Sequence, residues 1–166
     1  MNLYLIRHAI AEEESPSVED RQRALTEKGA KKMRNIAKGL KTLGIEFDYI
    51  ISSPYVRAQQ TAEILWDVLK LRKKIVISES ISPMGDPNQL LAEINENYTV
   101  NSLAIVGHEP YLSNLISLLT AGGAPIEMTF KKGWVCYLTT DDFHHTRKAT
   151  LQWLLTPGVL VEIGEG

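Results

Sequence analysis

Short apolar runs alternate along this chain with longer segments of helical periodicity, and this alternation constrains the fold more than any other feature. A short run of consecutive apolar residues is typical of a buried strand, whereas apolar residues three and four positions apart indicate an amphipathic helix. Their alternation predicts an α/β fold, with helices on the faces of a central sheet. The predicted strands are residues 3–6, 49–52, 75–78, 103–106, 133–138 and 149–154.

Four helices are predicted between these strands. Ser53 is expected to cap the second of them, with Pro54 in its first helical position. The first helix lies between Thr26 and Gly44, the second follows Pro54, the third covers about residues 87–97, and the fourth begins at Pro110 and ends before Gly122.

The composition fits one globular domain. The 166 residues contain no internal repeat, low-complexity tract or linker, so we expect a single domain over residues 1–166. The formal net charge is −2 and no Lys/Arg tract stands out, which argues against nucleic acid or an anionic membrane as a partner. No stretch reaches the ~18 apolar residues needed to span a bilayer, and no secretory leader precedes the first strand, so a cytoplasmic protein is expected.

Cys136 is the one cysteine, which leaves no partner for a disulfide within the chain. It lies in an apolar run, and we expect a buried thiol, which suits a reducing cytoplasm. Trp66, Trp134 and Trp153 also lie in apolar patterns and are assigned to the core.

Basic and imidazole side chains follow three of the predicted strands, at the points where the strands end. Arg7-His8 follows the first strand, Arg57 falls in the first turn of the helix after the second, and His108 follows residues 103–106. Ligands of open α/β sheets gather at the carboxyl ends of the strands. We therefore expect these four side chains to face one rim, where helix N-termini add positive potential.

Two arginines and two histidines at one rim favour phosphoryl transfer. This chemistry depends mostly on positioning and on stabilising the charge of the nonbridging oxygens, for which forked guanidinium donors are well matched and can take the place of a metal. One histidine can attack phosphorus and carry the group as a phosphoramidate, while the other donates to a phosphoryl oxygen. Flanking arginines oppose protonation of the attacking ring and keep it neutral.

Each of these residues also has a simpler structural explanation. An isolated Arg-His pair at a strand end is more often a salt-bridged or capping pair, Arg57 could be an exposed helix residue, and His108 could be a hydrogen-bonded histidine at a helix start. If all three structural explanations held, basic and imidazole side chains would follow three strands of one sheet, at the same edge, by coincidence. Their conjunction favours the functional interpretation.

Three segments carry a resemblance to a known family: residues 5–9 (Leu-Ile-Arg-His-Ala), residues 52–61 (Ser-Ser-Pro-Tyr-Val-Arg-Ala-Gln-Gln-Thr) and residues 106–108 (Val-Gly-His). They resemble the histidine phosphatase superfamily, also called the phosphoglycerate mutase-like fold. The short chain and residues 23–29 are most similar to its SixA-type phosphohistidine phosphatase branch. The resemblance spans nearly the whole chain and implies a three-layer α/β/α sandwich with a mostly parallel central sheet, and a hydrolase of the phosphatase class that needs no metal or other cofactor.

The resemblance also implies roles for individual residues. His8 would be the nucleophile that takes the phosphoryl group, and Arg7, Arg57 and His108 would form the phosphate pocket. Arg23 would also reach the phosphate. An equal alternative is that Arg23 has a structural role and caps the helix that begins at Thr26. The implied substrate is phosphohistidine on a signalling protein, such as the phosphohistidine domain of a phosphorelay component.

Two departures from the family pattern bear on mechanism and substrate. The residue after the nucleophile is commonly glycine and here is Ala9, which would matter if the turn needed a positive φ. Mutase-like members use a glutamate after the third strand as general acid, but Glu79 and Asp86 do not match that spacing, and Asp86 is better explained as a helix cap. An imidazole leaves phosphorus more easily than an alkoxide does, so a weak acid position favours a phosphohistidine substrate.

The sequence is also compatible with two other functions. One is a small-molecule phosphomonoesterase or mutase of the same superfamily, and the other is a noncatalytic phospholigand-binding module. His144-His145 with Asp141-Asp142 could form a metal cluster, but an exposed hairpin loop explains these residues better, and no metal is expected. The pattern does not indicate an oligomeric state.

Overall fold

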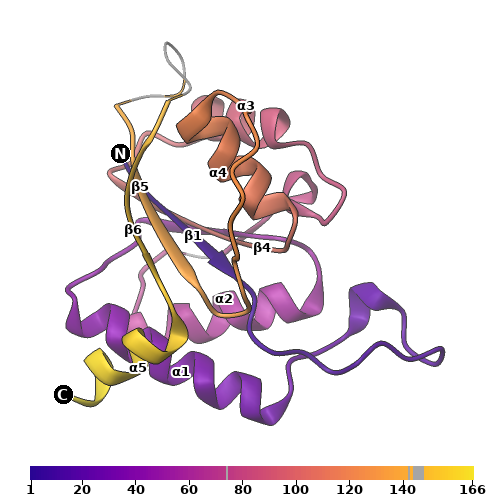
Figure 1. Cartoon of the computed structure of the whole chain (residues 1–166). Coiled ribbons are helices and arrows are strands. Elements are labelled where there is room, and N and C mark those ends of the chain that lie inside the picture. Colours follow the sequence, from indigo (N-terminus) through magenta and orange to yellow (C-terminus); the bar gives the residue numbers. More distant parts are fainter. Residues whose placement is uncertain (74, 142, 144–147) are drawn as a thin grey trace.

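The computed structural model describes residues 1–73, 75–141, 143 and 148–166. Within this part of the chain, a central six-stranded sheet has helices against both of its faces (Figure 1). The strands are β1 (Asn2–Arg7), β2 (Tyr49–Ser52), β3 (Val76–Ile77), β4 (Ser102–Gly107), β5 (Val135–Thr139) and β6 (Thr150–Leu155). The helices are α1 (Glu27–Thr42), α2 (Val56–Leu69), α3 (Pro87–Asn97), α4 (Tyr111–Ala121) and α5 (Pro157–Glu165), with short 3-10 helices η1 (Asp20–Gln22) and η2 (Glu79–Ile81).

The strand order is β3-β2-β4-β1-β5-β6. Neighbours from β3 to β1 are parallel, whereas β5 runs antiparallel to both β1 and β6, so the predicted mostly parallel sandwich is confirmed. β4 lies between β1 and β2, and the register pairs Arg7 with Gly107 and Ser52 with Val106. The carboxyl ends of these three strands therefore lie side by side at one edge of the sheet.

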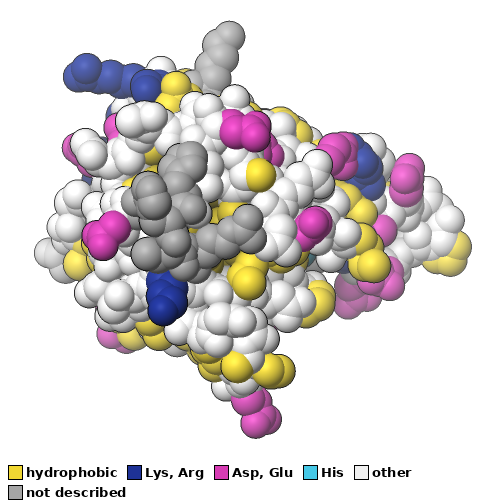
Figure 2. All heavy atoms as spheres, turned by 90° about the horizontal axis from the view of Figure 1, so that it is seen from above, with side chains coloured by type: hydrophobic (Ala, Val, Ile, Leu, Met, Phe, Trp, Pro, Cys, Tyr) yellow, Lys and Arg dark blue, Asp and Glu magenta, His cyan; other side chains and the backbone are white. Residues whose placement is uncertain are grey.

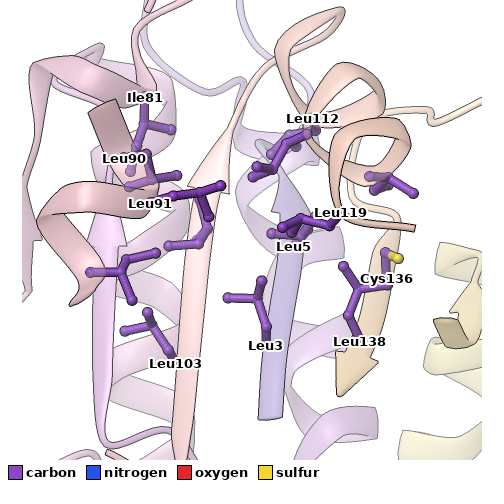
Figure 3. Packing of buried hydrophobic residues seen from close by; sticks show 14 of the residues in the cluster. Leu3, Leu5, Ile81, Leu90, Leu91, Leu103, Leu112, Leu119, Cys136 and Leu138 are labelled. Atoms are coloured by element: carbon purple, nitrogen blue, oxygen red, sulfur yellow. The ribbon is translucent and has the colours of Figure 1, made fainter. Parts of the chain in front are cut away.

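Alternate residues of β1 bury opposite faces of the sheet, as the two-residue period of a strand requires. Leu3 and Leu5 contact the apolar cluster beneath α3 and α4, drawn in Figure 3, whereas Tyr4 and Ile6 belong to the cluster against α1, α2 and α5. Cys136 lies in the first cluster, and burial raises the pKa of its thiol to about 12. The predicted buried thiol is confirmed.

All six predicted strands and all four predicted helices are present, with small shifts at their ends. The fifth helix, α5, is missing from the prediction. Its sequence contains Gly158 and Gly164, and glycine is among the weakest helix formers, so the helical signal is diluted. Packing against α1 stabilises α5 instead, and Leu160 is fully buried in the same cluster as Met33 and Ile36.

The assignment of all three tryptophans to the core is wrong for Trp66. Its side chain is 41% exposed, and its indole Nε1 donates to the carbonyl of Lys73 at 2.9 Å. Trp66 lies beside, and not on, the buried stripe of α2 that includes Ala62 and Leu65. Trp134 and Trp153 are half-buried and pack against the two clusters.

Gly39 sets how closely α5 approaches α1, and we expect Gly39→Ala to destabilise the fold. A Cβ at this position would lie 1.9 Å from the carbonyl oxygen of Leu160, so α5 would have to move. Helix propensity alone predicts a gain of up to about 1 kcal/mol for this substitution. Overpacking is expected to outweigh it and to lower the free energy of unfolding by about 1–3 kcal/mol, measured by urea denaturation.

Lys38→Ala, on the exposed side of the same helix, is the matched control and should change the free energy of unfolding by less than about 0.5 kcal/mol. A Gly39→Ala variant more stable than the parent would contradict the tight contact between the two helices.

Charged side chains are scattered over the surface seen in Figure 2, where Lys and Arg side chains lie singly among acidic and apolar ones. Among the described residues, no helix combines the length and the apolar character needed to cross a membrane. The longest of these helices, α1, has 16 residues and carries several lysines.

Candidate active site

The side chains predicted at three strand ends meet at one edge of the sheet. The backbone N–H of His8 donates to the carbonyl of Gly107 at 3.0 Å, and that of Ser53 donates to the carbonyl of Val106 at 3.0 Å. These bonds continue the strand pairing one residue beyond β1 and β2. As a result the rings of His8 and His108 lie together, with centroids 5.1 Å apart.

His8 is buried and presents one ring nitrogen to the site. Its Nδ1 lies 2.7 Å from the carbonyl oxygen of Ala9, which can only accept, so Nδ1 carries the proton and Nε2 keeps its lone pair. The Nε–H of Arg57 points at this Nε2 from 3.4 Å. Burial lowers the pKa of His8 to about 3 and outweighs the hydrogen bond to the carbonyl of Ala9, which raises it; the charges of Arg57 and Arg7 lower the pKa further. The ring is therefore neutral near pH 7.

Ala9, the departure from the usual glycine, fits its turn without strain. Among the described residues other than glycine, Lys70 has a positive φ and Ala9 does not. The backbone N–H of Ala9 donates to Thr61 Oγ1 at 3.1 Å, and that hydroxyl donates to the carbonyl of Arg57 at 2.7 Å. This turn therefore connects the end of β1 to the first turn of α2.

Arg57 is the second residue of α2 and is 5% exposed. Its Nη1 donates to the carbonyl of Asp20 at 2.7 Å, and its Nη2 lies 3.2 Å from the Asp20 carboxylate. Its guanidinium carbon also lies 4.9 Å from the centroid of the Tyr55 ring. Arg57 is thus fixed on three sides, with its Nε directed at His8.

Arg23 is joined to this cluster through Asp20. Its Nε donates to Asp20 Oδ1 at 2.7 Å, and its Nη1 donates to the carbonyl of Glu12 at 2.7 Å. Partial burial raises the pKa of Asp20, but hydrogen bonds and charge from Arg23 and Arg57 outweigh it and lower the pKa below its usual value. The alternative in which Arg23 caps the helix after Thr26 is wrong, because its hydrogen bonds go to these other partners.

Arg7 and Lys132 add positive charge to the site. Arg7 Nη1 donates to the carbonyl of Phe130 at 2.8 Å, and its Nε is buried with no partner among the described residues. Burial lowers the pKa of Lys132, and the charges of Arg7, Arg23 and Arg57 lower it further, which shows that its ammonium group shares their field. Lys132 is absent from the sequence prediction.

His108 is buried beside His8, and Ser53 is its partner. His108 Nε2 lies 2.7 Å from Ser53 Oγ, and His108 Nδ1 is buried with no partner in the described part of the chain. Burial, followed by the charge of Arg57, lowers the pKa of His108 to about 3. The prediction that Ser53 caps α2 with Pro54 in the first position is wrong, because the helix begins at Val56 and its N-cap is Tyr55.

The two weak candidates for general acid have other partners. Asp86 is the N-cap of α3, as the capping interpretation predicts, and its Oδ1 accepts from the backbone N–H of Asn88 at 2.9 Å. Glu79 is exposed and pairs with Arg21 at 2.6 Å. Arg21 in turn lies over the Tyr55 ring, and Tyr55 contacts His108, so two side chains connect Glu79 to this histidine.

The described residues contain no group of three or more His, Cys, Asp or Glu side chains that could hold a metal ion. Asp142, His144 and His145 lie outside the described residues, so their assignment to a hairpin loop stays a prediction. The chemistry of the donor set at the strand ends is that of an oxyanion site, with a neutral imidazole lone pair surrounded by cations and N–H donors.

The low pKa values of His8 and His108 predict that stability falls in mild acid. An unfolded histidine has a pKa near 6.5, so below that pH the unfolded chain binds protons that the folded chain does not. The free energy of unfolding should therefore decrease as the pH falls from about 6.5 toward 3, by up to about 1.4 kcal/mol per pH unit for each histidine.

Urea denaturation at several pH values between 7 and 5 measures the slope of the free energy of unfolding against pH. Carboxylates contribute little to this slope in that range. His108→Gln removes one of the two groups and should make the slope shallower. An unchanged slope in that variant would mean that His108 already titrates normally in the folded protein.

Known proteins share both the sequence pattern and the fold. Residues 3–83 match the model of the histidine phosphatase superfamily (branch 1). A phosphohistidine phosphatase SixA homolog of Haemophilus influenzae is 33% identical over 135 residues, which cover 76% of this chain and 81% of that protein. The phosphohistidine phosphatase SixA of Escherichia coli is 28% identical over 159 residues, or 95% of this chain and 94% of that one. A structure of the protein histidine phosphatase SixA complexed with tungstate superposes with a TM-score of 0.85 at 27% identity, over 96% of this chain and 99% of that chain.

Proposed function

Since this chain belongs to the histidine phosphatase superfamily, we propose that it dephosphorylates phosphohistidine on a signalling protein, without a metal and through a phosphohistidine intermediate on His8. The family model and the SixA-type relatives together support a phosphatase, and hence a hydrolase. The observation that carries the finer proposal is the buried, neutral His8, whose Nδ1 is held by Ala9 while its Nε2 faces Arg57.

In the first step, the Nε2 lone pair of His8 attacks phosphorus in line with the bond to the substrate imidazole. A P–N bond to His8 forms while the P–N bond to the substrate breaks, and the released nitrogen takes up a proton from solvent water. The nonbridging oxygens contact Arg7, Arg57 and His108, whose N–H donors stabilise their charge. Because His8 is neutral, no proton has to leave it before the attack.

In the second step, water attacks the phosphorus of phosphorylated His8. An O–P bond forms, the P–N bond to Nε2 breaks, the water loses a proton, and inorganic phosphate leaves. The hydrogen bond from Nδ1–H to the carbonyl of Ala9 keeps the ring in one tautomer through both steps. Arg23, held next to Arg57 by Asp20, supplies a further cation for the phosphate.

The nature of the leaving group supports a phosphohistidine substrate. Asp86 and Glu79 are engaged elsewhere, so an alkoxide would leave without a carboxylic acid from either candidate. An imidazole is protonated easily and needs less help. The relatives named phosphohistidine phosphatases support the same substrate class, and the one complexed with tungstate supports binding of a phosphate-like oxyanion.

Radiolabelled phosphohistidine protein tests this proposal directly. A phosphotransfer domain labelled on histidine by its kinase should lose its label at least about 100-fold faster, in kcat/KM, than phosphoglycerate or a sugar phosphate does. Rapid quenching should trap a labelled enzyme whose phosphate is released by acid and retained in base, as expected for a phosphoramidate.

The competing functions give different results in the same experiment. Much faster hydrolysis of sugar phosphates or phosphoglycerate would identify a small-molecule phosphatase, and transfer of the label to a sugar would identify a mutase. Binding of the phosphorylated domain without release of label in a single turnover would identify a noncatalytic module.

A further inference from the structure

Ser53 holds His108 in a way that the position of a helix cap does not explain. Ser53 is fully buried, and its Oγ lies 2.7 Å from His108 Nε2. The same Oγ accepts the backbone N–H of Tyr55 at 3.3 Å. The opposite ring nitrogen of His108, Nδ1, is buried and has no partner among the described residues.

The count of protons at this contact favours one tautomer. Burial and nearby arginines keep His108 neutral, so its ring carries one proton. With that proton on Nε2, Ser53 Oγ would accept twice, and its own O–H would have no acceptor in the described part of the chain. With the proton on Nδ1, the Ser53 hydroxyl donates to Nε2 and accepts from Tyr55. Each arrangement leaves one buried donor without an acceptor, the Ser53 O–H in the first and the His108 Nδ1–H in the second. The first arrangement also leaves the His108 Nδ1 lone pair unpaired, and each unpaired buried polar group costs free energy, which favours the second arrangement.

We propose that Ser53 is a positioning residue that fixes His108 in the Nδ1–H tautomer, so that a buried N–H is available to a phosphoryl oxygen. The two histidines then share one tautomer but present opposite groups. His8 uses its Nδ1–H on the carbonyl of Ala9 and offers the Nε2 lone pair to phosphorus. His108 uses its Nε2 lone pair on Ser53 and offers the Nδ1–H.

This tautomer explains how a neutral histidine can donate a hydrogen bond to an anionic phosphoryl oxygen. With the other tautomer, the Nδ1 lone pair of His108 would face the oxygen and repel it, although no other atom had moved. The catalytic part of this inference rests on the proposed phosphatase function, whereas the tautomer itself does not.

Long-range proton–nitrogen NMR of protein labelled with ¹⁵N-histidine measures the tautomer without any substrate. In the parent protein we expect a protonated Nδ1 and an unprotonated Nε2 for His108, whose signals are identified by their loss in His108→Gln. Ser53→Ala should shift both nitrogens toward a mixture of tautomers, whereas Ser53→Thr, which keeps a hydroxyl, should retain the parent pattern. Ser52→Ala is the control, because that buried hydroxyl donates to the carbonyl of Ser53 and not to His108.

The same variants connect the tautomer to catalysis. Ser53→Ala should lower kcat/KM for a phosphohistidine protein, and weaken inhibition by tungstate, by about tenfold, with partial recovery in Ser53→Thr. A parent protein protonated at His108 Nε2, or a Ser53→Ala variant that keeps the Nδ1–H tautomer, would overturn the proposal. If the NMR result is as expected but the parent releases no phosphate from any substrate, the tautomer assignment stands and the proposed phosphatase function fails.

Discussion

Replacing His8 with alanine should abolish turnover and leave a folded protein. Removal of a nucleophile that acts together with its neighbours costs on the order of 10⁴–10⁶ in rate, because no second group in the site can form the covalent intermediate. His8 is buried just beyond β1 among the polar and charged side chains of the site, and the apolar side chains of the two clusters, which stabilise the fold, are unchanged in this variant. Single-turnover assays with a histidine-phosphorylated protein, together with circular dichroism, measure both effects.

His108→Ala is the matched comparison, since it removes the neighbouring imidazole and leaves the proposed nucleophile. This variant should still form phosphoenzyme, at a rate reduced about 10²- to 10³-fold, as expected for the loss of one donor to the phosphoryl group. Near-normal turnover of His8→Ala, or phosphoenzyme in His8→Ala and none in His108→Ala, would reverse the roles of the two histidines.

The positions of these histidines could be predicted because they depend only on strand ends. An apolar run fixes where a strand stops, and the carboxyl ends of parallel strands fall on the same edge of a sheet. That argument brings His8 next to His108 although 100 positions separate them in the numbering, and their rings lie 5.1 Å apart. It needs no knowledge of the loops.

Loop residues could not be placed by the same reasoning. Asp20 lies in a segment without periodicity, 37 positions before Arg57, and nothing in its sequence neighbourhood indicates that its carboxylate joins Arg57 to Arg23. Ser-Pro before a helical stripe favours Ser53 as an N-cap, but Pro54 and Tyr55 lie between Ser53 and the first residue of the helix. Those two residues free the Ser53 hydroxyl for His108.

The Arg57–Asp20 contact shows how a surface loop participates in the site. η1 is short and none of its residues is buried, yet Asp20 supplies both a carbonyl and a carboxylate to Arg57. A guanidinium has five N–H donors in a fixed plane, so Arg57 can keep these bonds and still donate to a phosphoryl oxygen. A lysine ammonium at the same position has three donors and no fork.

Arg57→Lys should therefore lower kcat/KM for a phosphohistidine protein by about 10³-fold, although the positive charge is retained, because an arginine at a transferring phosphoryl group contributes about 10³–10⁵ in rate. Inhibition by tungstate should weaken in parallel, since the fork binds the oxyanion. Arg34→Lys is the matched control: that exposed arginine pairs with Asp67 at 3.5 Å, and its replacement should change kcat/KM less than about twofold. If Arg57→Lys retained activity within threefold, charge alone would suffice, and the planar contacts from Arg57 to Asp20 and His8 would have no part in catalysis.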